Sequence, residues 1–174
     1  MLTLKYNDEK DRALGLGGMA VSLVMWENAR YLQRLSLDAP VGEGVALTPD
    51  FFLQRNQRAS AKAVWTRDVE MFQTEAGMLV ANVASRAYIG RREPIDRETR
   101  ELIVKALADS GSEACGLEEG EVRTVADKII GYFSQVLAYP AVASIVGEFA
   151  ETLRQERSME RDRVVELLGR LERL

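Results

Sequence analysis

The feature that most constrains this chain is the spacing of its apolar residues, which recur every three or four positions over long stretches. The clearest stretch, in the middle of the sequence, contains Trp65, Val69, Phe72, Ala76, Leu79 and Val83. Apolar residues at this spacing lie on one side of an α-helix, and that side must be buried against other elements. Because the pattern covers most of the chain, we predict an all-α fold.

Residues that begin helices divide this pattern into a bundle of about five or six helices. The starting points are Asn7, Thr48 with Pro49, Asp96 and Pro140. Short polar side chains cap the first turn of a helix, and proline is well accommodated there. The predicted helices cover residues 8–36, 48–89, 96–108, 118–138 and 141–174.

Loops and strands are expected to be a small part of the fold. Segments rich in glycine, proline and small polar residues are predicted to connect the helices; they cover residues 37–46, 90–94 and 109–116. The second helix is expected to break near residues 56–60 and to end at Gly90. The first six residues, MLTLKY, alternate in polarity and predict a short strand or an ordered arm. No strand is predicted after residue 7.

The length of 174 residues corresponds to one domain, so residues 1–174 are predicted to form a single helical domain. The last helix changes character along its length, because residues 151–163 are mostly charged and an apolar seam follows. The seam consists of Val164, Leu167, Leu168, Leu171 and Leu174. Two interpretations are open: residues 151–174 protrude and pack on a partner, or this helix folds back on its own bundle.

The segment LGLGGMAVSLVMW, residues 14–26, has the glycine spacing of a dinucleotide-binding turn. Such a turn needs a strand directly before it and a parallel strand after it, and neither is predicted here. A membrane span needs about 20 apolar residues, more than this uncharged segment offers. We therefore predict that Gly15, Gly17 and Gly18 let another helix approach closely. Gly77, Gly131 and Gly147 invite the same interpretation.

The chain contains no histidine and a single cysteine, Cys115. The absence of histidine excludes Ser-His-Asp and Cys-His catalysis and ordinary catalytic zinc sites. A lone cysteine cannot form an intrachain disulfide, which suits a reducing compartment, and we expect a cytoplasmic protein without a membrane segment. The net charge of −4 does not favour a nucleic-acid partner.

Polar residues on two of the predicted helices form the best candidate site. If both helices are central, these groups would meet inside the bundle, where each needs a hydrogen-bond partner. The candidate residues are Glu27, Asn28, Glu75, Asn82 and Arg86. They could line a pocket for a small ligand, or they could form a structural polar network or a solvated flank.

Pairs of glutamates three residues apart occur at 98 and 101, 118 and 121, and 148 and 151. Such pairs share a helix face and could hold Mg²⁺. Helices rich in glutamate produce this spacing by chance, and the complementary Glu-x-x-Asp pair is missing. We therefore predict no metal site and no cofactor.

Charge is distributed unevenly, with basic residues over 54–67 and acidic residues over 106–122. Such stretches could dock on each other, within one chain or between two copies. Together with the C-terminal seam, they favour a non-catalytic interaction or adaptor protein that acts as a homodimer, with the seam as its interface. The alternative is a small-ligand-binding or Mg-dependent nucleotide-processing protein that uses the polar pocket. No catalytic residue is identified.

Overall fold

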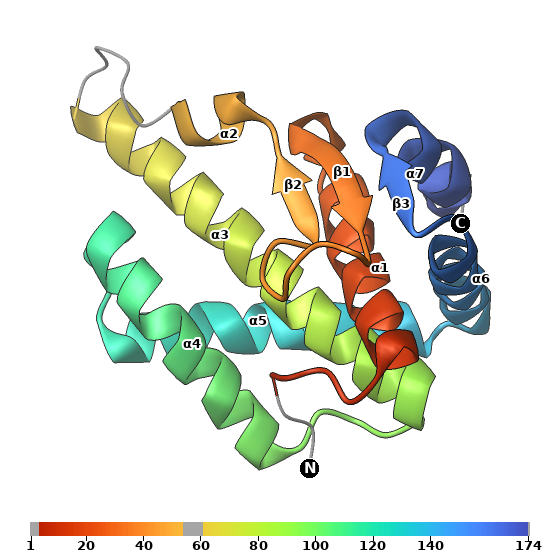
Figure 1. The fold of residues 1–174 in the computed structure, drawn as a ribbon. Helices are drawn as coiled ribbons and strands as arrows, with labels where there is room; N and C mark the ends of the chain where they lie inside the picture. Colours follow the sequence, from red (N-terminus) through yellow and green to blue (C-terminus); the bar gives the residue numbers. More distant parts are fainter. Residues whose placement is uncertain (1–3, 54–60, 174) are drawn as a thin grey trace.

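The computed structural model describes residues 4–53 and 61–173 and confirms a mostly helical single-domain fold (Figure 1). Its helices are α1 (Glu9–Met25), α2 (Pro49–Leu53), α3 (Ala61–Ser85), α4 (Arg97–Cys115), α5 (Glu119–Ala138), α6 (Pro140–Glu156) and α7 (Arg161–Leu168). Shorter helical segments are η1 (Ala29–Tyr31), the π-helix η3 (Arg86–Arg91) and η4 (Gly169–Arg173). Three strands complete the fold, β1 (Leu32–Ser36), β2 (Val45–Leu47) and β3 (Ser158–Glu160).

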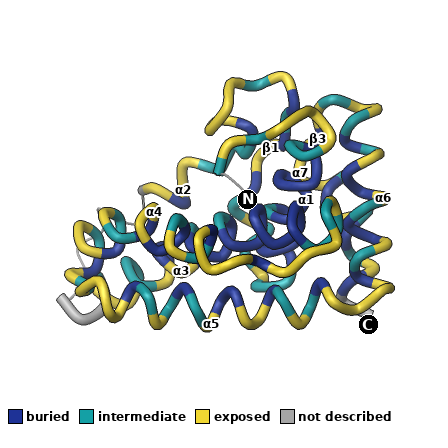
Figure 2. Tube along the Cα trace, turned by 90° about the horizontal axis from the view of Figure 1, so that it is seen from below, coloured by how far each residue is buried: buried dark blue, intermediate teal, exposed yellow. Residues whose placement is uncertain are grey.

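The core is built around α1, which contacts α3, α6, α7 and β1. All residues from Ala13 to Val24 except Met19 are buried. Figure 2 shows this stretch as almost uninterrupted burial, whereas α5 alternates between buried and exposed positions. A helix that is apolar nearly all round must lie inside the bundle, as its sequence predicts. The Asp8 side chain, rather than that of Asn7, caps its first turn by accepting from Asp11 N.

Close packing explains the glycines of α1. A Cβ atom at Gly18 would overlap the carbonyl group of Ala81 on α3, and one at Gly15 would lie 2.7 Å from the Asn82 side chain. The two backbones can therefore meet only because side chains are missing, which confirms the prediction for these residues. The prediction is wrong for Gly131, where an added Cβ atom would meet nothing within 4 Å.

The first predicted helix is too long, because α1 ends at Met25 and β1 occupies Leu32–Ser36. β1 pairs antiparallel with β2 and with β3, in the order β2-β1-β3. The partners of β1 include Ser158–Glu160, more than a hundred residues along the chain. A strand stabilised by such a distant partner leaves no periodic signal in its own short sequence.

The C-terminal segment folds back and does not protrude. α6 ends at Glu156, the next residue Arg157 has a positive φ of 65°, and β3 then returns the chain toward β1. Val164, Leu168 and Leu171 are buried in the chain's own core, and Leu167 packs against it. Leu174 lies outside the described residues. The described residues of the apolar seam therefore pack against the helical bundle of the same chain.

The ends of the other helices follow the predictions in part. Asp96 caps α4 by accepting from Thr99 N at 2.7 Å, but α4 continues to Cys115, so most of 109–116 is helical rather than loop. Arg92 rather than Gly90 takes the left-handed position after η3. α5 agrees closely with the prediction, and a bend of 91° separates it from α6. The predicted break at 56–60 lies outside the described residues.

Within the described ranges, no single helix is both long enough and apolar enough to cross a membrane; α5 and α6 reach that composition only as a bent pair.

Candidate functional site

A cleft of about 590 Å³ opens where α1 ends, between η1, α2, α3 and α5; we call it the α1-end cleft. This volume suits a small organic molecule. Apolar and aromatic side chains line part of it: Trp26, Tyr31, Phe51, Met71, Val125 and Ile129. Polar and charged groups line the remainder: Glu27, Asn28, Arg30, Arg67, Glu70, Gln73, Thr74 and Lys128.

The backbone at the end of α1 places Glu27 in the cleft. Asn28 N donates to Leu23 O at 2.7 Å, and Glu27 N donates to Val24 O at 3.1 Å. These two bonds form a Schellman motif, in which the residue after the cap adopts a left-handed conformation. Glu27 occupies that position, with φ 58°. Glycine is the usual residue there, and α4 uses Gly116 at φ 67° for the same purpose.

Glu27 is locally unfavourable for two reasons. A left-handed backbone costs a residue with a side chain about 1–2 kcal/mol. A carboxylate at the C-terminal end of a helix also faces the negative end of the helix dipole, and the last turn of α1 carries no basic residue in compensation. Among the described residues, the Glu27 carboxylate has no hydrogen-bond or ion-pair partner.

Trp26 forms a rigid wall of the cleft. A Cβ atom at Gly77 would overlap the indole, so the ring fits against α3 only because residue 77 is glycine. On its other side, the ring centroid lies 5.5 Å from that of Phe133 and 6.0 Å from that of Tyr132, both on α5. Contact with two helices fixes the position of the indole, and its remaining surface borders the cleft.

Polar contacts also fix Asn28 and Arg30. Asn28 Nδ2 donates to Thr74 Oγ1 at 3.1 Å, and Thr74 Oγ1 donates to the Glu70 carbonyl at 2.9 Å. Thr74 is buried, so this chain of bonds satisfies its hydroxyl group. The Arg30 guanidinium lies 4.7 Å from the centre of the Tyr31 ring and donates to its hydroxyl. Both side chains are therefore held in place before a ligand arrives.

The structure separates the five residues predicted from the sequence as one pocket. Glu27 and Asn28 line the α1-end cleft, whereas Glu75 borders a second depression of about 490 Å³ between α3 and α4. Asn82 and Arg86 face the beginning of α1 and the N-terminal arm. The separation arises because α1 and α3 run antiparallel, so that the end of α1 lies beside Thr74 rather than beside Asn82.

Arg86 is fully buried and anchors the N-terminal arm. Its Nε and Nη2 donate to the Asp11 carboxylate at 2.8 and 2.7 Å, and Nη2 also donates to Lys5 O at 2.6 Å. The Tyr6 ring lies 4.9 Å from the guanidinium, and Tyr6 Oη accepts from Asn82 Nδ2. Residues 4–7 thus form the ordered arm, and the described part of MLTLKY contains no strand. This arrangement is a structural polar network.

The pKa of Asp11 reflects opposing influences of its surroundings. Burial raises the pKa. Hydrogen bonds from Arg86 and from Asn7 N, together with the positive charge of Arg86, lower it by more than burial raises it. The net result is a pKa below the ordinary value of 3.8, so Asp11 remains ionised beside Arg86 at neutral pH.

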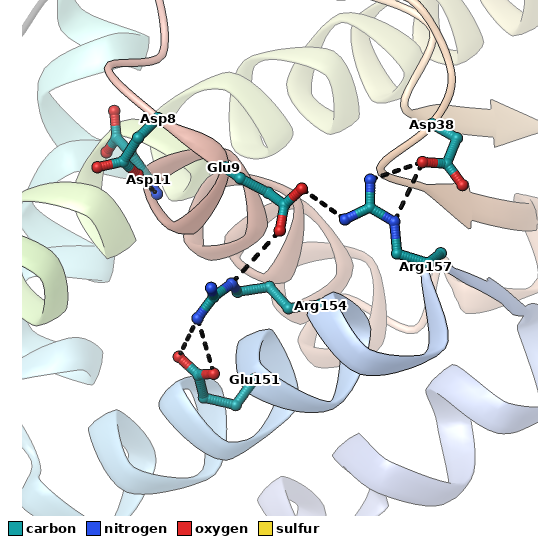
Figure 3. Close-up of polar contacts among 7 residues, drawn as sticks. All are labelled: Asp8, Glu9, Asp11, Asp38, Glu151, Arg154 and Arg157. Atoms are coloured by element: carbon teal, nitrogen blue, oxygen red, sulfur yellow. Dashed lines mark hydrogen bonds and ion pairs between the residues drawn. The ribbon is translucent and has the colours of Figure 1, made fainter.

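A second charged cluster, shown in Figure 3, joins the start of α1, the end of α6 and the segment after β1. Arg157 donates to Asp38 and to Glu9, and Arg154 pairs with Glu9 and with Glu151. The hydrogen bond from Arg157 lowers the pKa of Glu9. Each charge in this chain of alternating signs has a partner, so the cluster serves to hold three segments together.

No group of three or more metal-ligating side chains occurs among the residues that the structure describes. The sequence does not predict most of the cleft, including Trp26, Thr74 and Lys128. The one available signal was the abrupt change from apolar to polar residues at Glu27. Comparisons with protein-family models, with curated proteins and with solved structures found no match.

Proposed function

We propose that this protein binds a small molecule in the α1-end cleft. The observation that carries the proposal is Glu27, a carboxylate held in a left-handed backbone at the negative end of α1. Local rules of stability favour glycine at this position. Residues that break such rules without local compensation are concentrated at functional sites, and Glu27 borders a preformed cleft.

The walls of the cleft support this role. Trp26 is fixed by two helices, Asn28 is held by Thr74, and Arg30 is held by Tyr31. Groups that are already ordered lose little entropy when a ligand binds, which increases affinity. With no histidine in the chain and with Cys115 outside the cleft lining, the side chains of the cleft favour recognition over nucleophilic catalysis.

Self-association as an adaptor stays a prediction. Its proposed interface loses support because Val164, Leu168 and Leu171 are buried within the chain. The ligand-binding proposal does not depend on oligomeric state.

Tryptophan fluorescence and thermal stability together test the proposal. The chain has two tryptophans, and a Trp65→Phe background leaves Trp26 as the only indole reporter. A broad set of amino acids, peptides, nucleotides and aromatic acids would be screened for changes in Trp26 emission and for a raised melting temperature. Binding to the native state raises that temperature by mass action.

Two variants make the screen specific to the cleft. Glu27→Gln keeps the shape of the side chain but removes its charge, and we expect it to abolish or weaken the response. Glu43→Gln, at an exposed position outside the cleft lining, is the matched control and should respond as the parent does. No response to any compound, or responses that Glu27→Gln leaves unchanged, would refute the proposal.

A further inference from the structure

The charges around the α1-end cleft narrow the class of ligand, on the premise that the proposed function is correct. Carboxylates come from Glu27 and Glu70, and cations come from Arg30, Arg67 and Lys128. Arg30 is already engaged with Tyr31. In contrast, Glu27, Glu70 and Lys128 have no side-chain ion-pair partner within the described part of the chain.

A ligand with one sign of charge would meet opposition in this cleft. An anion would have to approach Glu27 and the negative end of α1. A simple cation would enter a space in which three cationic side chains outnumber two carboxylates. A molecule that carries both signs of charge can place each charge beside a group of opposite sign, which avoids bringing like charges together.

We infer that the ligand is a zwitterion with an apolar side group, of the class of free amino acids and short peptides. Its ammonium group is recognised by Glu27, its carboxylate by Lys128, and its apolar group by the buried side chains of Met71 and Ile129. The volume of about 590 Å³ accommodates an amino acid and leaves room for a second residue. In this assignment, the Glu27 carboxylate binds the ammonium group of the ligand.

Four leucine derivatives test the two charges separately. Leucine and leucyl-leucine carry both charges, N-acetyl-leucine lacks the ammonium group, and leucinamide lacks the carboxylate. Titrations would follow Trp26 emission in the Trp65→Phe background. Each hydrogen bond to a charged group contributes about 1.5–3 kcal/mol, so loss of either charge should weaken binding by about tenfold or more.

Variants then connect each charge to its residue. In Glu27→Gln, the preference for leucine over N-acetyl-leucine should disappear, while the preference over leucinamide persists. In Lys128→Met, the preference for leucine over leucinamide should disappear, while the preference over N-acetyl-leucine persists. Lys105→Met, at an exposed position on α4 outside the cleft lining, is the control and should keep both preferences. Thermal unfolding of each variant verifies that it is folded before titration.

The outcomes distinguish this inference from the proposed function. Equal binding of leucine and N-acetyl-leucine would overturn the zwitterion assignment, as would a response confined to nucleotides or aromatic acids. In that second case, loss of the response in Glu27→Gln would still support the cleft as a binding site. Silence of Trp26 toward every compound class would overturn both.

Discussion

Replacing Glu27 with glycine should stabilise the protein while weakening ligand binding. The left-handed backbone at φ 58° costs glutamate about 1–2 kcal/mol, and glycine adopts it freely. Glycine in turn loses about 0.4–1 kcal/mol more entropy on folding. Removing a carboxylate from the negative end of α1 adds about 0.3–1 kcal/mol in favour of the variant. The net expectation is a gain of about 1 kcal/mol.

Equilibrium denaturation by urea measures this change, and a thermal scan should show an increase of about 2–4 °C. Glu27→Ala keeps the backbone cost and removes only the charge, so its gain should be smaller. Gly116→Ala is the converse substitution, because it adds a side chain at a position with a left-handed backbone of φ 67°. The added Cβ atom meets nothing within 4 Å, so only the backbone conformation opposes it. It should destabilise the protein by about 1 kcal/mol.

A Glu27→Gly variant that is less stable than the parent protein would contradict this prediction. That result would mean that the carboxylate stabilises the fold through a contact of its own, and the reason for assigning it to a ligand would be lost. A gain in stability with unchanged binding in the fluorescence screen would also refute the functional role of Glu27.

Four further variants test the packing and the buried charges. Gly18→Ala should lose about 1–3 kcal/mol because its Cβ atom overlaps the Ala81 carbonyl, whereas Gly131→Ala should gain up to about 1 kcal/mol in an open helix position; urea denaturation separates the two. Asp11→Asn should lose about 3–5 kcal/mol at neutral pH because it leaves buried Arg86 unpaired. Since the pKa of Asp11 is lowered by folding, its contribution is complete above the ordinary value of 3.8 and is lost as pH falls further, so the two proteins should converge in stability in acid. Deleting residues 164–174 should unfold or strongly destabilise the chain rather than only change its oligomeric state, which circular dichroism and sedimentation would distinguish.

The sequence predicts best the elements whose stability is local. The apolar side of α5 repeats regularly over its whole length and predicts the helix almost to the residue, and Asp96 is predicted as a cap because its bond to Thr99 spans only three residues. β1 could not be predicted, since its pairing with β3 depends on contacts across most of the chain. The end of α1 is not predictable either, because a Schellman motif normally contains glycine at its left-handed position and this one contains Glu27.

The candidate site was predicted only in part for a related reason. Glu75 and Asn82 are seven residues apart on α3, which puts them on similar sides of the helix but about 10 Å apart along its axis. Over that distance the neighbouring element changes from α4 to α1. Periodicity identifies the side of a helix on which a residue lies, but it cannot identify which element covers that side.

The central place of α1 has a consequence for biosynthesis. This most apolar helix is synthesised before α6 and α7, which supply part of its cover and lie more than a hundred residues further along the chain. The roughly one hundred residues between them take on the order of ten seconds to translate. During that interval the nascent chain exposes the apolar surface of α1, which chaperones recognise. Efficient production in cells should therefore depend on the availability of chaperones.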